Sequence, residues 1–147
     1  MEFKTKQTGW AIVIISIVVC VFMAIAAFYL GQAQSETVMM SISIIIVFGL
    51  VLALFSTLET TVSEKDIKIK FGVGLIKKTI PLDSIESMTV VRNKFWYGWG
   101  IRLTPHGWLW NIAGYDAVEF VLKDNARKFR LGCADAKELM AEIKKRK

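Results

Sequence analysis

The strongest chemical signal in the sequence is a run of basic and aromatic side chains. Within eight residues it contains two cations and four aromatic rings: Arg92, Lys94, Phe95, Trp96, Tyr97 and Trp99. Indole and phenol rings favour the boundary between water and lipid, and a cation near an anionic leaflet gains about 1 kcal/mol. We therefore expect these six residues to contact lipid headgroups or a protein partner.

Residues that could carry catalysis are scattered. His106, the single histidine, lies in a Thr-Pro-His-Gly turn without neighbouring metal ligands, which is typical of a solvated side chain. Cys133 has no adjacent group that would stabilise a thiolate, and Asp83 and Glu86 belong to a turn and an exposed strand face. Gly72–Gly74 lacks the rest of a phosphate-binding loop. The sequence predicts no catalytic, cofactor-binding or metal-binding residue, and it indicates that the protein is not an enzyme.

Composition divides the chain into two parts. Of its 147 residues, 54% are hydrophobic and 22% are charged, and the mean hydropathy of +0.44 exceeds that of a typical soluble domain. Residues 10–58 contain one charged residue, Glu36, whereas residues 59–147 contain 17 of the 19 Lys and Arg. We therefore expect a membrane segment followed by one folded domain over 59–147.

Two uncharged segments of 21 residues are long enough to cross a bilayer as helices: Trp10–Leu30 and Val38–Leu58. The short polar connection Gly31–Thr37 requires these helices to run antiparallel. The alternative for the first segment is a cleaved signal peptide, but its apolar run exceeds the roughly 7–15 residues of a signal core. Transmembrane helices over 10–30 and 38–58 are therefore favoured.

Basic residues predict the orientation of this hairpin. The N-terminal segment 1–9 carries Lys4 and Lys6, the connection 31–37 carries no basic residue, and lysines resume after the second helix. The positive-inside rule then makes 1–9 a cytoplasmic tail and 31–37 an external loop, with both termini in the cytoplasm. Small residues at four-residue spacing on both helices favour close packing of the hairpin, with a homo-oligomer as the alternative.

After Thr60 the hydrophobic pattern changes to the period of two that is typical of strands. Residues 66–71 alternate cleanly, with Ile67, Ile69 and Phe71 on one face and lysines on the other. Turn signals then separate further alternating segments. The sequence predicts seven or eight short antiparallel strands without a crossover helix, among them 66–71, 75–80, 85–91, 100–104, 108–112, 117–122 and 128–133.

The chain ends in an amphipathic helix. Asp135 is a good N-cap, and Glu138 three residues later completes a pair that resembles a capping box. The apolar stripe of this helix consists of Ala136, Leu139, Met140 and Ile143. A strand meander followed by one helix predicts a small all-β roll or barrel with a C-terminal capping α-helix.

Four segments carry a family resemblance: IPLDSIESMTVV (80–91), YGWGIR (97–102), GWLWNIAGYDAVEFVL (107–122) and RKFRLGCADAKELMAEI (127–143). Together they resemble the membrane-anchored bacterial proteins with a pleckstrin-homology-like (PH-like) domain. The resemblance covers 59–147 well and the hairpin by arrangement only, and Cys133-Ala134 departs from an expected Gly-Thr. It implies a PH-like roll of two near-orthogonal sheets in a bacterial cytoplasmic membrane, and it implies no reaction.

Chain direction predicts where the aromatic run lies. If the first strand leaves the membrane, a simple meander brings the turn at 72–74 back to it, and the loop at 92–99 returns there as well. The turns at 63–66 and 81–84 then lie away from the membrane. The alternative is that aromatic rings fill the core, which is favoured for Trp108 and Trp110 and disfavoured for Trp96 and Trp99.

In the folded domain, Lys and Arg exceed Asp and Glu by six, which favours a basic face beside an anionic leaflet. Candidates for this face are Lys77, Lys78, Arg92, Lys94, Arg102, Arg127, Lys128 and Arg130. No nucleic-acid motif accompanies the charge. We therefore predict a non-enzymatic, membrane-anchored PH-like scaffold or regulatory module that contacts the lipid bilayer or a protein partner. The alternative is an accessory subunit of a larger membrane enzyme or transport complex.

Overall fold

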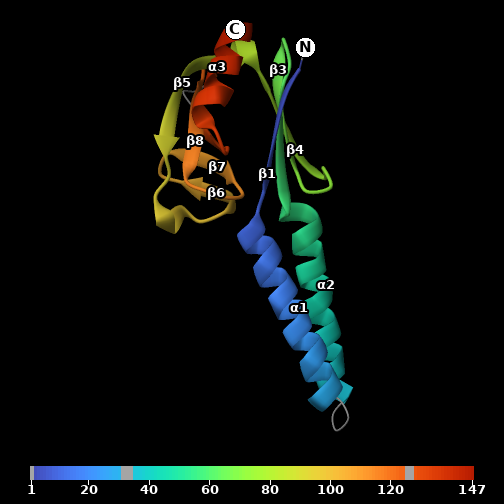
Figure 1. The fold of residues 1–147 in the computed structure, drawn as a ribbon. Coiled ribbons are helices and arrows are strands. Elements are labelled where there is room, and N and C mark those ends of the chain that lie inside the picture. The colour runs from blue at the N-terminus through green and yellow to red at the C-terminus, as the bar shows by residue number, and fades with distance from the viewer. Residues whose placement is uncertain (1, 31–34, 125–127) are drawn as a thin grey trace.

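Two long helices are attached to a β-rich body in the computed structural model, which describes residues 2–30, 35–124 and 128–147 (Figure 1). Helix α1 spans Trp10–Leu30 and α2 spans Ser35–Phe55, and the two pack antiparallel. Helix α2 begins inside the expected connection 31–37, of which residues 31–34 lie outside the described residues. It ends before Leu58, because Thr57 and Leu58 pair in a sheet.

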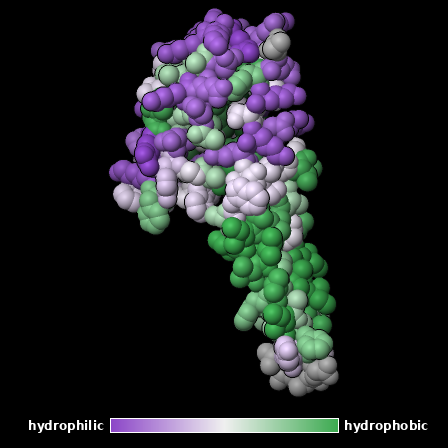
Figure 2. Space-filling model, in the orientation of Figure 1, coloured by the Kyte–Doolittle hydropathy of each residue, from purple (hydrophilic) through white to green (hydrophobic). Residues whose placement is uncertain are grey.

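Both helices are long and apolar enough to cross a membrane, judged by length and composition. In each, 6% of the apolar window is buried, so most of the apolar surface visible in Figure 2 is not covered by the β body. Ser16 and Ser41 are buried along the helix pair. Gly49, from the expected stripe of small residues, faces open space instead.

The first sheet, sheet A, has four antiparallel strands in the order β1-β2-β3-β4. Their bounds are Phe3–Thr8, Thr57–Val62, Asp66–Phe71 and Ile76–Pro81. The segment 1–9, expected as a tail, thus supplies the edge strand β1, in which Phe3 pairs with Val62 and Thr8 with Thr57. Its alternation of half-buried residues with exposed Lys4 and Lys6 is typical of an edge strand.

The second sheet, sheet B, has the strand order β5-β8-β9-β7-β6. Its strands β5 to β9 span Ile85–Arg92, Gly100–Thr104, Gly107–Asn111, Asp116–Leu122 and Lys128–Gly132. Pairing is antiparallel except between β7 and β9, where Trp108 lies beside Phe129 in a parallel register. The expectation of a wholly antiparallel meander is therefore wrong at this pair, because the β8–β9 hairpin inserts between β5 and β7.

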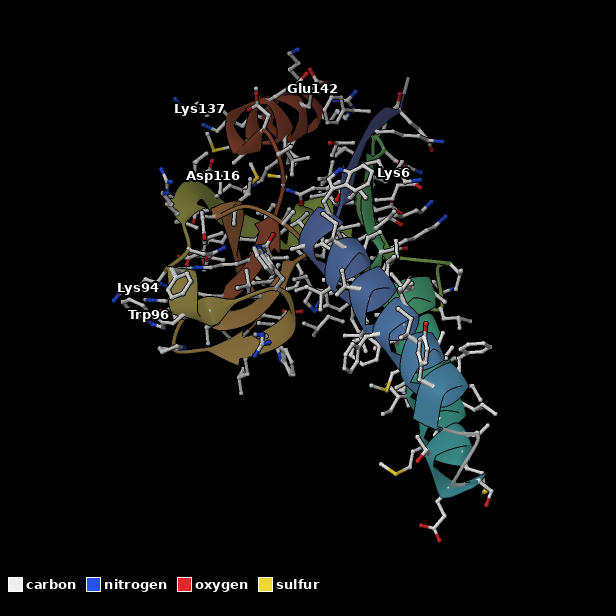
Figure 3. The ribbon with its side chains drawn as sticks, turned by 60° about the horizontal axis from the view of Figure 1, so that its bottom comes forward. Lys6, Lys94, Trp96, Asp116, Lys137 and Glu142 are labelled. Carbon is white, nitrogen blue, oxygen red and sulfur yellow. The ribbon has the colours of Figure 1, made fainter. Side chains whose placement is uncertain are left out.

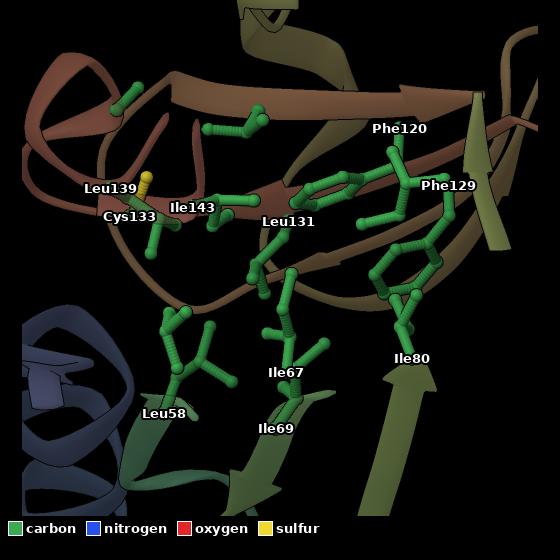
Figure 4. Packing of buried hydrophobic residues seen from close by; sticks show 14 of the residues in the cluster. Leu58, Ile67, Ile69, Ile80, Phe120, Phe129, Leu131, Cys133, Leu139 and Ile143 are labelled. Carbon is green, nitrogen blue, oxygen red and sulfur yellow. The ribbon is translucent and has the colours of Figure 1, made fainter. Parts of the chain in front are cut away.

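The hydrophobic core lies between the two sheets and under helix α3, which spans Ala136–Arg146 (Figure 4). The inward alternation of Ile67, Ile69 and Phe71 is confirmed, since all three are fully buried. The N-cap is confirmed as well, because the Asp135 carboxylate accepts a hydrogen bond of 2.9 Å from the Glu138 amide. Two sheets with a C-terminal helix agree with the expected coarse architecture, while the PH-like assignment stays a prediction.

The β body has two distinct ends. At the helical end, the β3–β4 turn rests on α2: the amide of Val73 donates to the Ala53 carbonyl at 3.0 Å. The loop 92–99 and strands β6 and β7 lie at this same end in Figure 1. The far end carries the turns at 63–66 and 81–84, joined by a hydrogen bond from the Leu82 amide to the Lys65 carbonyl.

Candidate interaction surface at the helical end of the β body

The aromatic run forms the connection from β5 to β6, the two edge strands of sheet B. Four strand spacings of about 4.8 Å separate these edges by about 19 Å. The seven residues 93–99 reach about 25 Å at full extension, so little slack remains. The loop must therefore cross the whole width of sheet B at the helical end.

A single turn of 3₁₀ helix, η2 at Phe95–Tyr97, shapes the middle of this loop. The amides of Tyr97 and Gly98 donate to the carbonyls of Lys94 and Phe95 at 3.0 and 3.3 Å. Gly98 ends the turn at φ 63°, a left-handed conformation that glycine adopts without steric cost. This local turn directs the side chains of Phe95 and Trp96 away from the sheet.

A buried polar network holds the base of the loop. Asn93 is buried. Its backbone amide donates a hydrogen bond to the Tyr115 carbonyl at 2.7 Å, and its side-chain oxygen accepts one from Arg130 Nη1 at 3.2 Å. Arg130 in turn donates through Nε to Glu119 Oε2 at 2.7 Å. Because Arg130 comes from the central strand β9, the network ties the loop to the middle of sheet B.

The charge of Glu119 is maintained within this network. Burial is the largest single influence and would raise the pKa of its carboxyl group, but the hydrogen bonds and positive charges of Arg130 and Lys128 together outweigh burial. Lys128 Nζ, 3.5 Å from Glu119 Oε1, acts in the same direction. The pKa of Glu119 is therefore lowered, and the ion pair persists at neutral pH.

Four of the six predicted residues are exposed, and three of these four are consecutive in the loop after β5. Phe95 is 77% exposed and Trp96 is 70% exposed, which is unusual for such large apolar side chains. Lys94 Nζ lies 5.1 Å from the centre of the Trp96 ring, within range of a cation–π contact. Figure 3 shows Lys94 and Trp96 together on the outer side of the β body. They combine an apolar surface with a positive charge.

The other three residues contact the body more closely. The guanidinium of Arg92 is exposed but lies 6.0 Å from the ring of Tyr115. Tyr97 is partly buried, and its ring packs edge-on against His106. Trp99 is also partly buried, and its carbonyl accepts a hydrogen bond from Arg102 Nε. Arg92 thus ends β5, and the other five residues lie in the loop that follows it, where Tyr97 and Trp99 are partly buried.

A second apolar feature at the helical end was missed by sequence reasoning. In the β3–β4 turn, Val73 is 69% exposed and Leu75 is 77% exposed. Lys70 and Lys77, both exposed, lie directly opposite each other on the strands beside them. The sequence had located this turn correctly, and its available signal was the pattern Val-Gly-Leu, since apolar residues are unusual in a solvated turn.

The remaining tryptophans behave differently from each other. Trp110 packs against Phe71 and Phe129 with ring centres 5.5 and 5.8 Å away, so its assignment to the core is confirmed. Trp108 is 50% exposed, so for this residue the core assignment is only half right. The two rings share one face of β7, but Trp108 lies where the space between the sheets opens to solvent.

The expected basic face is divided among several environments. Arg130 is buried in the network, and Lys128 pairs with Glu119. Lys78 is half-buried, and Arg127 lies outside the described residues. The exposed cations that remain near the helical end are Lys77, Arg92 and Lys94, with Arg102 beside the loop.

Groups with catalytic potential show no common site in the described part of the chain. Burial and the charges of Asp135 and Asp116 raise the pKa of the Cys133 thiol to about 12, so a thiolate is scarce at neutral pH. Asp83 and Glu86 are both exposed at the far end. Among described residues, no cluster of three or more His, Cys, Asp or Glu side chains is placed to hold a metal ion.

The geometry of the helical end is suited to contact with a surface that is apolar and anionic. No model of a known protein family and no curated protein matches this chain.

Proposed function

We propose that this protein is a non-enzymatic, membrane-anchored module of the bacterial cytoplasmic membrane, whose β body contacts lipid headgroups and serves as a scaffold or regulator. Helices α1 and α2 cross the bilayer as a hairpin, and the helical end of the body faces the cytoplasmic leaflet. The PH-like assignment and the bacterial source come from the sequence resemblance. The observation that carries the proposal is the exposure of Phe95 and Trp96 beside Lys94 at the end where the helices leave.

The environment of the helices supports membrane insertion. A core helix of a soluble protein is mostly buried, whereas α1 and α2 expose large apolar side chains along their length, among them Ile14, Phe22, Ile46 and Leu50. The helices contact each other far more than they contact the β body. Lipid is the environment that would cover this apolar surface.

Strand β1 supports both the anchor and the orientation. It precedes α1 and pairs with β2, which follows α2, so the two ends of the helical pair return to one sheet. A signal peptide cleaved after α1 would remove an edge strand of sheet A. An even number of crossings keeps β1 and β2 on one side, and the lysines of 1–9 favour the cytoplasmic side.

The test is a measurement of lipid contact in the reconstituted full-length protein. A nitroxide placed at Trp96→Cys is compared with one at Asp83→Cys, an exposed far-end position, in a Cys20→Ser background. Cys133 stays in place because its raised pKa and burial make it slow to react. We expect the label at 96 to collide with lipid-dissolved oxygen and the label at 83 to collide mainly with an aqueous nickel chelate.

Equal aqueous access at the two positions would contradict the proposal. Co-purification of the full chain in mild detergent supplies the second measurement. A stoichiometric protein partner that shields residue 96 would indicate the accessory-subunit alternative, whereas lipid contact in the purified protein supports the proposed module.

A further inference from the structure

A cavity of about 440 Å³ opens between β4 of sheet A and the β6–β7 hairpin of sheet B. It lies where the space between the sheets reaches solvent, and it does not include any residue of the loop 92–99. Its apolar walls are Leu103, Trp108, Leu122 and Phe129, and its one half-buried charged group is Lys78. Ligand pockets typically have volumes of about 300–1,000 Å³ and few polar groups, so this cavity has the usual size and lining.

Lys78 occupies an inward-facing position of its strand. Its register partner is Ile69, and Ile80, two residues along, is fully buried. Its neighbours Lys77 and Thr79 point outward and are exposed. An aliphatic side chain at this position would complete the core pattern, so the lysine is not explained by sheet formation.

The ammonium group of Lys78 lacks an anionic partner among residues 2–30, 35–124 and 128–147. Among these residues, it interacts with aromatic rings: Nζ lies 4.5 Å from the centre of Phe129 and 5.9 Å from that of Trp110. Burial lowers the pKa of Lys78, and no carboxylate in the described part of the chain counters this effect. A cation that loses water without gaining a counter-ion is costly, and a bound anion would remove that cost.

We propose that this cavity binds an anionic amphiphile with one short alkyl chain, whose carboxylate or phosphate pairs with Lys78. The chain would lie along Leu103 and Trp108, which are 71% and 50% exposed and are directly opposite each other on β6 and β7. Lys128 at the rim is already paired with Glu119, so Lys78 supplies the uncompensated charge. This site does not depend on contact between the 92–99 loop and a membrane.

The experiment is calorimetric titration of the full-length protein in phosphatidylcholine nanodiscs, with empty nanodiscs as the reference for partitioning. The probes are octanoate, octyl phosphate and octanol, which share a chain length and differ in the head group. We expect saturable binding of octanoate or octyl phosphate at one site, and the tighter of the two identifies the head group. Octanol should give no saturable signal above that of empty nanodiscs.

Lys78→Met keeps the aliphatic stem and removes the charge, and it should weaken binding about tenfold or more. Lys77→Met, the adjacent exposed lysine, is the matched control and should bind as the wild type does. Equal affinity in the wild type and Lys78→Met, equal binding of octanol, or heats identical to those of empty nanodiscs would each overturn the proposal. If Lys78→Met fails to fold, Trp108→Ser should reduce the same affinity, because it removes part of the apolar wall.

Discussion

The two ends of the β body are built from turns of the same strands, yet they expose opposite kinds of side chain. The helical end exposes Val73, Leu75, Phe95 and Trp96. The far end exposes charged side chains in the turns at 63–66 and 81–84 and on the last turn of α3. Figure 2 shows the same contrast, with the hydrophilic surface gathered over the part of the body away from the helices.

Core packing does not account for this difference. Beneath the far-end turns, Ile67, Leu82 and Ile85 are buried, and beneath the helical end, Leu58, Phe71 and Ile112 are buried to the same degree. Single exposed apolar residues are common on any protein, but four large ones at one end form a pattern. The contrast therefore concerns the surroundings that each end contacts, and it can be tested by substituting residues at one end at a time.

The largest effect on stability is expected from Arg130→Met, which disrupts the polar network at the base of the helical-end loop. The substitution leaves the largely buried Glu119 carboxylate and the buried Asn93 side chain without their guanidinium partner. Breaking such a buried pair should lower the free energy of unfolding by about 3–5 kcal/mol. Thermal and denaturant unfolding of the detergent-solubilised protein, followed by near-UV circular dichroism, measures this loss.

Arg92→Met is the matched control, because Arg92 is exposed and should change stability by less than about 0.5 kcal/mol. Hydrogen exchange adds the spatial test: Arg130→Met should speed exchange in 93–99 and leave the turn at 81–84 unchanged. Similar losses for both arginines would mean that the buried network does not hold the loop.

A smaller effect is expected where the β3–β4 turn rests on α2. At Gly72, φ is 48° and an added Cβ would collide with the Ala53 carbonyl oxygen, so Gly72→Ala combines a left-handed conformation with overpacking. We expect a loss of about 3 kcal/mol. Gly74→Ala shares the positive φ but meets no atom closer than Lys70 Cδ at 3.9 Å, so it should cost about 1–2 kcal/mol. Equal unfolding free energies for the two variants would argue against a tight contact between turn and helix.

The sequence predicted most elements of the fold but not all of their partners. Alternation at 66–71 and the N-cap at Asp135 are local signals, and they are confirmed by burial and by a hydrogen bond, respectively. The strand at Phe3–Thr8 and the parallel β7–β9 pair depend on which segments meet in space, and local patterns carry little information about this. Strand β1 alternates as a strand does, but its place at the edge of sheet A depends on its pairing with β2, which lies some 50 residues further along the chain.

At the candidate site, too, local features could be predicted from the sequence and contacts between distant segments could not. The run from Arg92 to Trp99 was visible in composition, and its position at the helical end followed from counting strand directions. Sequence alone could not show that Arg130 is buried beneath it, because a lysine-rich and arginine-rich domain suggests a solvated basic face. Nor could it show Lys78 in a cavity, since the alternation of β4 reveals an inward lysine only once the facing sheet is known.

Acid titration should reveal the contributions of two carboxylates to stability: Glu119, in the network beneath the loop, and Glu142, on α3 at the far end. The pKa of Glu119 is lowered in the folded state, and so is that of Glu142, where hydrogen bonds from Lys145 and Arg146 are the main cause. Stability from such groups is complete above the unfolded pKa of about 4.5 and is lost as pH falls through the lower folded value. Below pH 4.5, the free energy of unfolding of the wild type should therefore decline as the pH falls. Each of the substitutions Glu119→Gln and Glu142→Gln should make this decline smaller.

Salt distinguishes the two contributions. One partner of Glu142 is the exposed Lys145, so high salt should screen the ion pairs of Glu142 more strongly than the pair of Glu119 with Arg130, whose side chains are 12% and 9% exposed. At high salt, we expect Glu142→Gln to match the wild type and Glu119→Gln still to flatten the pH dependence. The reverse pattern would place the stronger electrostatic contribution at the far end.

The smallest change in intrinsic stability is expected from the substitutions that matter most for the proposed function. Phe95→Ser with Trp96→Ser removes exposed rings and should alter unfolding in detergent by less than about 0.5 kcal/mol. In nanodiscs with anionic lipid, the wild-type β body should gain stability, because lipid binds the folded loop and not the unfolded chain. The double variant should lose that gain, which a comparison of melting temperatures with and without anionic lipid measures.

A far-end variant, Lys65→Ser with Asp83→Ser, serves as the control for this last prediction. Both residues are exposed, and at about 3.3 Å per residue a six-residue strand holds them about 20 Å from the helical end. They should therefore keep the full lipid-dependent gain. If both double variants keep it equally, the net positive charge of the β body, which neither variant changes, would explain the stabilisation, and the contrast between the ends would have no functional meaning. Loss in the loop variant alone assigns the gain to Phe95 and Trp96, since their removal leaves the number of charges unchanged.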